Sequence, residues 1–487
     1  MNQTIDSTEI RRIPIVAVML VGAFVGLLNE TLLATALPSI MADFGIAENK
    51  VQWLTTAFLL TNGIMIPISA FLIQRFTTRQ LFITALSIFG LGTFIASISH
   101  AFELLLVARV VQAAGSGVML PLMMTVMLRI FPVEKRGAAM GMSGIVISFA
   151  PAIGPTLSGW LLEFTSWRGL FYVVLPIVII AIITACIFVK NVTEQTYPKI
   201  DILSILLSSF GFGGLLYGFS SISGGHGGEA STNINGASIA IIVIAAIILA
   251  AFIIRQLKLK NAMLEFRVFK YPIYSLSLVL TMIVLMALIG AETMLPLYMQ
   301  NTRGFSPLES GLMLLPGAIV MGIMSPITGM LFDRLGAKWL AVTGMTIVTV
   351  TTFLFTNLDL DTSFVYLSVI FAIRMFGLSL VMMPVMTAGL NQLPIEWHPH
   401  GTAMANTMQQ VSASIGTAIL ISVMTTTAAH YQPDQEAIAG LSEVDILNQA
   451  SISGYNTAFW VATALSAIGL IMTFFLKTKA QTNNTAK

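Results

Sequence analysis

Long apolar runs follow one another along almost the whole chain, and short polar segments that hold most of the charges separate them. A transmembrane helix needs about 20 apolar residues, and a helix satisfies its own backbone polar groups within a bilayer. The pattern therefore predicts an all-α, polytopic membrane protein with fourteen spanning helices. Their expected limits are 13–37, 52–73, 80–98, 104–126, 138–161, 169–189, 202–222, 236–255, 272–299, 308–332, 338–357, 363–385, 402–426 and 456–476.

Composition strengthens this interpretation, because 56% of the 487 residues are hydrophobic and only 9% are charged. A typical soluble domain is about 25% charged, so an ordinary soluble enzyme is excluded. The net charge of +2 leaves no basic surface for nucleic acid. Cys186 is the single cysteine, which excludes an intramolecular disulfide. No further ligands cluster with His398 and His400 in the sequence, so we expect neither a metal site nor catalytic residues.

The distribution of positive charge predicts an orientation. Nineteen of the 24 Lys and Arg residues fall on the side of the bilayer that holds both termini, whereas the opposite loops contain only Lys50, Arg168 and Arg303. Loops rich in Lys and Arg stay in the cytoplasm. We therefore expect a multi-pass protein of the cytoplasmic membrane with both termini in the cytoplasm. The first apolar run is long for a signal-peptide core and contains Asn29 and Glu30, so we expect it to be retained.

Two distant parts of the sequence look like copies of each other. Segments 70–79 and 329–338 share a spacing of polar residues, and two spans after each comes an arginine within an apolar run, Arg109 or Arg374. A six-span unit used twice explains this pattern, and secondary transporters are often built from such repeats. The expected parts are a tail (1–12), an N-terminal six-helix bundle (13–190), a linker with two extra helices (191–271), a C-terminal six-helix bundle (272–476) and a second tail (477–487).

Segment 329–338 reads Gly-Met-Leu-Phe-Asp-Arg-Leu-Gly-Ala-Lys and matches in full the loop motif of the major facilitator superfamily, which the chain resembles. The matching residues are Gly329, Asp333, Arg334, Gly336 and Lys338. Glycines permit a tight turn, while the acid and the cations can hold helix ends in one conformation. The amino-terminal copy departs from the motif, with Gln74 where an acid is usual and Thr77 in place of a glycine.

Within that superfamily the chain resembles the fourteen-span drug:proton antiporter family. The fifth span carries a motif similar to the family's antiporter motif, with Gly144, Pro151, Gly154, Pro155 and Gly159. Its small residues suit close helix packing, and its bends suit two halves that rock. The first span has Asn29 where an aspartate is usual and the acid at Glu30, as in a subgroup similar to lincomycin exporters. The resemblance implies two six-helix bundles plus two inserted helices, driven by the proton motive force without a cofactor.

Four charged residues lie well away from the ends of the predicted spans, where charge is unfavourable and needs a reason. Glu30 follows a stripe of small residues and should face the bundle interior, either as a proton carrier or as a static hydrogen-bonding group. Glu292 is a second candidate, for proton coupling or for attraction of cationic substrates. Arg109 is either a relay for these protons or a helix clamp, and for Arg374 we favour the clamp.

Several polar residues within the spans are candidates for the lining of a substrate cavity. They are Asn29, Asn62, Gln112, Tyr298, Gln300, Asn406, Gln409 and Gln410. The 28 methionines and 30 phenylalanines suit a pocket that accepts many shapes, although most of them should simply fill space.

Together these features predict proton-coupled efflux of amphiphilic or cationic drugs by alternating access. The expected partners are these compounds, protons and the lipid bilayer, with a periplasmic adaptor only if the host has two membranes. One alternative is a transporter of the same fold for a specific metabolite, lipid or siderophore, and another is a membrane sensor or scaffold that moves nothing. The sequence lacks a G-x-x-x-x-G-K-[ST] loop, which argues against ATP-driven pumping.

Overall fold

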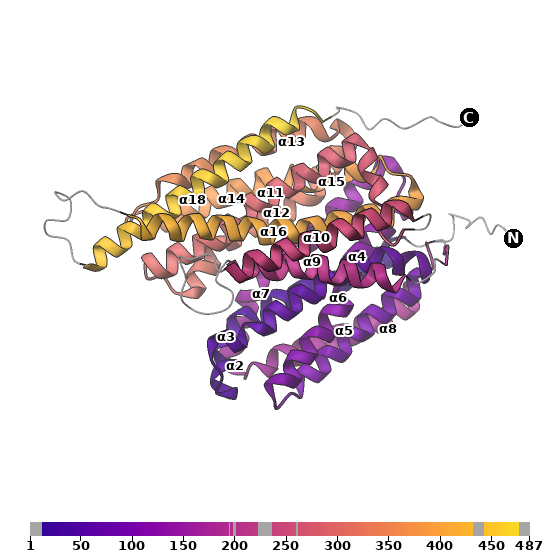
Figure 1. The fold of residues 1–487 in the computed structure, drawn as a ribbon, viewed down its shortest axis with the longest axis horizontal. Coiled ribbons are helices and arrows are strands. Elements are labelled where there is room, and N and C mark those ends of the chain that lie inside the picture. Colours follow the sequence, from indigo (N-terminus) through magenta and orange to yellow (C-terminus); the bar gives the residue numbers. More distant parts are fainter. Residues whose placement is uncertain are drawn as a thin grey trace.

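The computed structural model describes residues 12–193, 195–197, 201–222, 236–259, 262–431 and 443–476. Within these ranges the chain is built of helices and contains no strand. The long helices run side by side from one end of the molecule to the other (Figure 1). Helix α1 begins and α18 ends at the same end, which we call the terminal end; the opposite end is the distal end.

The first group of helices contains six long elements. They are α1 (Arg12–Leu32), α4 (Trp53–Arg75), α5 (Thr78–Ser97), α6 (Phe102–Ile130), α7 (Arg136–Phe164) and α8 (Arg168–Phe188). Shorter elements are α2 (Leu37–Phe44), α3 (Glu48–Val51) and the 3-10 turns at Ala34–Ala36 and Val133–Lys135. The first span was predicted to reach residue 37, but α1 ends at Leu32, because Pro38 opens α2 within its first turn.

The rest of the chain contains an inserted helix pair and a second group. The pair is α9 (Ile202–Ile222) and α10 (Gly236–Lys258). The second group is α11 (Pro272–Leu297), α12 (Pro307–Leu335), α13 (Ala337–Leu354), α14 (Phe364–Ser379), α15 (Met382–Leu390), α16 (His398–Ala429) and α18 (Glu443–Thr473). Short helical turns lie at Phe266–Lys270, Tyr298–Thr302, Phe355–Asn357 and Ile395–Trp397.

The helices agree closely with the predicted spans. Thirteen described helices are long and apolar enough to cross a membrane, and α7, whose two parts are bent by 42°, is the fourteenth when it is counted as one. The all-α fold class is therefore confirmed. The last helix begins at Glu443 rather than near residue 456, so part of the predicted distal loop is helical. The acidic residue Asp445 in its first turn suits the positive end of the helix dipole.

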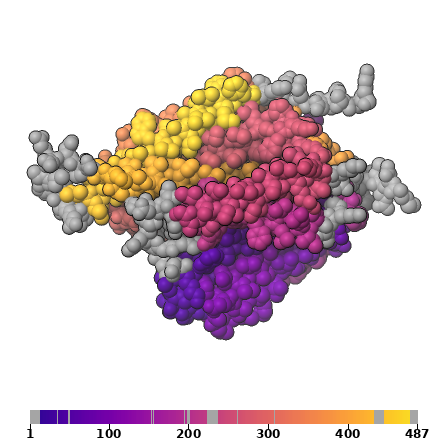
Figure 2. All heavy atoms as spheres, viewed as in Figure 1, coloured from indigo at the N-terminus to yellow at the C-terminus, as the bar shows by residue number. Residues whose placement is uncertain are grey.

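The two groups meet along a seam in which α7 packs against α12 and α4 packs against α16. Near the terminal end one buried cluster continues across the seam. It contains Met123, Met124 and Met127 of α6 together with Met386 of α15 and Met404 of α16. The inserted helix α9 contacts both α4 and α16, and Figure 2 shows the inserted pair in magenta between the indigo-to-purple first group and the orange-to-yellow second group. The molecule is therefore closed at its terminal end.

Candidate functional site

Arg109 lies about two turns from the distal start of α6, and its side chain is fully buried. Its Nη1 donates to Oδ1 of Asn29 at 2.5 Å and to Oε1 of Gln112 at 3.0 Å, and its Nε donates to the carbonyl of Leu54 at 3.3 Å. The guanidinium also lies over the ring of Phe58, 4.1 Å from the centroid. Arg109 therefore joins α1, α4 and α6 through atoms that carry no formal negative charge.

Glu30 follows Asn29 in α1, and its Oε2 is buried without a hydrogen-bond partner among the described residues. Nη2 of Arg109 is likewise buried without a partner. The two charges interact through space, but the four ion pairs found in the described parts of the chain do not include them. Buried polar atoms are normally hydrogen-bonded. The carboxyl of Glu30 can therefore bind a proton. Either group can also bind a water molecule or the other group.

A similar arrangement occurs in the second group. Arg374 of α14 is fully buried, and its Nη2 donates to the carbonyl of Ala287 in α11 at 2.8 Å. Its Nε donates to Oγ1 of Thr352 in α13 at 3.2 Å, while Nη1 has no partner in the described chain. Glu292 of α11 interacts with this arginine through its charge. Each group thus has, in its distal half, a buried arginine that interacts with a carboxylate from another helix of the same group.

The two arginines differ in how they reach the neighbouring helix. In the first group Gln112 accepts from Arg109 and donates from its Nε2 to Oγ1 of Thr93 in α5 at 2.9 Å. In the second group Arg374 contacts Thr352 directly. In the first group, Gln112 thus lies between the arginine and the threonine of the neighbouring helix. In the second group, the arginine and the threonine are bonded directly.

Asp333, the acid of the loop motif, lies across the seam at the start of α7. Its two carboxylate oxygens accept the backbone N–H groups of Gly137 at 2.8 Å and Ala138 at 3.0 Å. These are among the N–H groups that a helix leaves unpaired in its first turn, and an anion there is favoured by the helix dipole. A methyl group on Gly329 would collide with the carbonyl of Gly137. The motif therefore fastens the seam at the terminal end.

The other motif residues form the turn between α12 and α13. Gly336 has φ +79°, a conformation that side chains with a Cβ rarely adopt. Arg334 is exposed and Lys338 is half-buried. The glycine therefore has a clear backbone role, and the two cations flank the turn.

The small residues of the fifth span do not all face one partner. A side chain on Gly144 would meet Ser325 of α12, whereas one on Gly154 would meet Thr31 of α1. Nothing lies close to the Cβ position of Gly159. The small residues of α7 thus serve two different contacts, one at the seam and one in the interior of the first group.

The bend in α7 separates Val133–Pro151 from Thr156–Phe164. Pro151 and Pro155 lie at this break, where a proline removes one helical hydrogen bond and kinks the helix. The bend that the sequence suggests for this span is therefore present.

Two predicted cavity residues lie at the seam. Asn406 of α16 donates to the carbonyl of Thr402 at 2.8 Å and towards the sulfur of Met124 in α6 at 3.5 Å. Gln409 donates towards the sulfur of Met386 at 3.9 Å. Thioether sulfur is a weak acceptor, so the side chain of Gln409 is weakly held, whereas that of Asn406 is also held by the carbonyl of Thr402.

The remaining candidates are dispersed. Asn62 of α4 is buried, and its Oδ1 has no partner among the described residues. Tyr298 is fully buried near the distal end, where its hydroxyl donates to the carbonyl of Asp359. Gln300 and Gln410 are half-buried. Of this set, Asn29 and Gln112 are brought together at Arg109, and Tyr298 lies within the distal packing of the second group.

Several contacts across the terminal seam were missed from the sequence. The side-chain amide of Gln74 hydrogen-bonds to Nε2 of His400 at 2.5 Å, and Nη1 of Arg136 donates to Oδ1 of Asn391 at 3.0 Å. The sequence offered one sign of the first contact. Gln74 stands where the motif usually has an acid, and a different side chain at a contact implies a different partner.

In the described ranges, up to fourteen membrane-spanning helices, two repeated arginine–carboxylate sites and a seam closed at one end are typical of a secondary transporter. Residues 19–417 match the family model of the Major Facilitator Superfamily, and the chain belongs to this family. It is therefore a multi-pass membrane transporter, and this family indicates no catalytic activity.

Curated relatives cover nearly the whole chain. It is 52% identical to the uncharacterized MFS-type transporter YcnB of Bacillus subtilis, over 98% of each chain. It is 43% identical to the lincomycin resistance protein LmrB of the same organism, over 97% of each chain. The multidrug transporter protein MdtP of Bacillus subtilis is 28% identical over 80% of this chain and 71% of that protein.

Among solved structures, the human organic anion transporter MFSD10 superposes with a TM-score of 0.67. The match covers 95% of this chain and 99% of the other at 12% sequence identity, so it shows the fold alone.

Proposed function

We propose that this transporter exports amphiphilic, drug-like compounds across the cytoplasmic membrane in exchange for protons, with both termini in the cytoplasm. The observation that carries the proposal is the buried, unpartnered carboxylate oxygen of Glu30 beside the buried charge of Arg109. The lincomycin resistance protein and the multidrug transporter protein among the relatives support the choice of substrate class.

The closed terminal end suggests how proton binding from outside is kept separate from drug binding from inside. In the proposed orientation the distal end faces outwards, so protons from outside reach Glu30 while the seam at Asp333 is shut. Protonation removes the attraction between Glu30 and Arg109 and changes the relative free energies of the two conformations. Opening at the terminal end then releases the proton inside and admits the drug. One proton that moves down 100 mV supplies about 2.3 kcal/mol.

Other residues take supporting roles in this scheme. Glu292 is the second proton carrier or attracts cationic compounds. Asn62 and Gln409 are offered as polar contacts for the substrate, because Oδ1 of Asn62 has no partner among the described residues and Nε2 of Gln409 is held only by a thioether sulfur. Asn406 is offered because it lies beside Met124 where the two groups meet. The proton motive force drives the exchange without a cofactor. A periplasmic adaptor enters the proposal only for a host with two membranes.

Everted membrane vesicles test the proposal. Compounds that include lincomycin, lipophilic cations and neutral amphiphiles are added after a pH gradient has formed, and a pH-sensitive dye reports its loss. We expect at least one class to dissipate the gradient with the parent protein and not with Glu30→Gln. Glu103→Gln is the matched control, because Glu103 is an exposed acid paired with Lys50 at the distal surface.

Normal coupling in Glu30→Gln would remove this residue from the scheme. Saturable transport of a single metabolite, lipid or siderophore, without a response to lipophilic cations, would support the transporter of narrow specificity instead. An absence of flux for every compound in proteoliposomes would favour a sensor or scaffold.

A further inference from the structure

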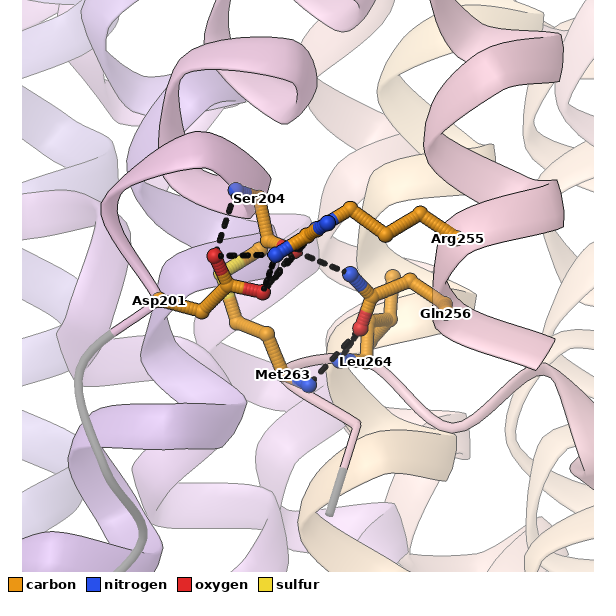
Figure 3. Close-up of polar contacts among 6 residues, drawn as sticks. All are labelled: Asp201, Ser204, Arg255, Gln256, Met263 and Leu264. Atoms are coloured by element: carbon orange, nitrogen blue, oxygen red, sulfur yellow. Dashed lines mark hydrogen bonds and ion pairs between the residues drawn. The ribbon is translucent and has the colours of Figure 1, made fainter. Parts of the chain in front are cut away.

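The two inserted helices are tied together where they enter and leave the transporter. Asp201 precedes α9, and its carboxylate forms a two-pronged ion pair with Arg255 of α10, with distances of 3.0 to 3.1 Å (Figure 3). Ser204 donates from its hydroxyl to the same carboxylate at 2.6 Å. Such two-pronged contacts fix geometry as well as charge. The base of the inserted pair is therefore a defined structure.

The same base is joined to the segment that follows the insert. Gln256, which is fully buried, donates to the hydroxyl of Ser204 at 2.6 Å. Its Oε1 accepts the backbone N–H groups of Met263 at 2.8 Å and Leu264 at 3.3 Å (Figure 3). One side chain thus holds the inserted helices to the segment before α11.

Both flanks of the insert then reach the seam between the two groups. The segment before α9 contributes the N–H of Thr196, which donates to the carbonyl of Gln74 at 3.0 Å. The segment after α10 contributes the N–H of Glu265, which donates to Nδ1 of His400 at 3.3 Å. Gln74 and His400 are the pair that bridges α4 and α16 at 2.5 Å. Each flank therefore bonds one member of the pair that closes the seam.

The two ring nitrogens of His400 link the contact with Glu265 to the contact with Gln74. Because Nδ1 accepts the backbone N–H of Glu265, a neutral ring carries its proton on Nε2 and donates it to Gln74, whose side-chain amide must then present its oxygen rather than its NH2 group to the ring. His400 is 5% exposed, so water is a poor substitute for either partner. Loss of the Glu265 contact frees the ring to turn and weakens its bond to Gln74.

We propose that the inserted helix pair is a clasp that holds the terminal end of the transporter closed, acting through Gln256 and His400 on the contact between α4 and α16. The clasp consists of Asp201, Ser204, Arg255, Gln256, Glu265 and His400. It goes beyond the export activity proposed above and holds for any transported compound. The clasp must release before α4 and α16 separate, so it sets the proportion of molecules open at the terminal end.

Spin labels across the seam measure this proportion. In the full-length protein with Cys186→Ser, labels at Phe76→Cys and Glu396→Cys lie at exposed positions just after α4 and just before α16. Pulsed dipolar spectroscopy in detergent or lipid then gives the populations with short and long distances. The first variant, Gln256→Met, removes the hydrogen bonds between the inserted helices and the segment before α11. The second, His400→Leu, removes the hydrogen bonds between that segment and the seam. The third combines both substitutions.

We expect each single variant to raise the ratio of open to closed molecules roughly fivefold, the size expected for a lost buried hydrogen bond. The combined variant should show no more than either single one, because both changes break the same chain of contacts. A loss of general stability would instead multiply the two effects. Lys50→Gln, which breaks an exposed ion pair at the distal end, is the control and should leave the distances unchanged.

Unchanged distances in either single variant, or effects that multiply in the combined one, would overturn the proposal. If Gln256→Met does not fold, Arg255→Gln takes its place and must show the same lack of additivity with His400→Leu. Because no substrate is needed, failure of the clasp is distinguishable from failure of the drug-export proposal.

Discussion

Arg109 donates a 2.5 Å hydrogen bond to Oδ1 of Asn29 and makes no ion-pair contact with Glu30, the next residue of α1. The neutral amide pairs with Nη1 of the guanidinium, while Nη2 and the carboxylate of Glu30 each keep a free atom. The first span has its acid at Glu30, one position after the place where the family usually has an aspartate. Helix contact and an available carboxylate are therefore assigned to different residues, because Asn29 bonds Arg109 and Glu30 keeps an unpaired oxygen.

The first prediction concerns the planar shape of Arg109. In Arg109→Lys a single ammonium group cannot reach Asn29, Gln112 and the carbonyl of Leu54 together. We expect the variant to lose about 1.5–3 kcal/mol of stability, the range for hydrogen bonds to a charged group. Thermal unfolding in detergent measures this, and a melting temperature equal to that of the parent would show that the charge alone matters.

Two glycines of α7 provide a matched pair. A methyl group in Gly137→Ala collides with Oδ1 of Asp333 and with the carbonyl of Gly329, so we expect the seam to loosen and transport to fall. Gly159→Ala meets open space, and we expect it to be neutral or slightly stabilising, because alanine favours helix by up to about 1 kcal/mol. Transport assays and melting temperatures of both variants should differ clearly. Equal behaviour would contradict the close contact at Gly137.

Asp333→Asn tests the charge at the seam while it preserves the size of the side chain. The anion should contribute about 0.3–1 kcal/mol at the start of α7, and up to about 2 kcal/mol when it is partly buried. We therefore expect more molecules to open at the terminal end, measured as a longer distance between labels at the exposed positions Glu134 and Leu335. Asp361→Asn, in an exposed distal turn, is the control. Distances that match the parent would assign the contact to shape rather than charge.

The ion pair at the base of the inserted helices predicts a pH dependence. Partial burial raises the pKa of Asp201, but hydrogen bonds from Arg255 and Ser204 outweigh it and hold the pKa below the ordinary value of 3.8. A lowered pKa in the folded state gives stability that is present above the ordinary value and is lost as pH falls through the folded value. The difference in melting temperature between the parent and Asp201→Asn should therefore stay constant from about pH 8 to pH 5. A difference that shrinks within this interval would show that the pKa is not lowered.

Features that depend on local sequence were predictable. Apolar length defined the spans, and isolated charges within them identified Arg109, Glu30, Arg374 and Glu292, because each rule acts within a few residues. The partners of these charges were not predictable in the same way. The carbonyl of Leu54, which accepts from Arg109, has no signature in the sequence, since every residue carries a carbonyl.

Contacts between distant segments were also hidden. Gln74 and His400 are separated by 326 residues, and their pairing depends on how two groups of helices meet. Tyr298 looked like a cavity residue because it is polar and lies within an apolar run, yet its hydroxyl serves the distal packing by donating to Asp359. Polarity within a span shows that a partner is needed and leaves open which partner it is.

The two buried arginines also constrain how the molecule can move. Every contact of Arg109 stays within the first group, and the described contacts of Arg374 stay within the second. Each group can therefore rotate as a rigid body while its arginine keeps all of its hydrogen bonds. Rotation then requires the contacts that span the groups to exchange, and there single hydrogen bonds, small residues and methionines can change partners one at a time.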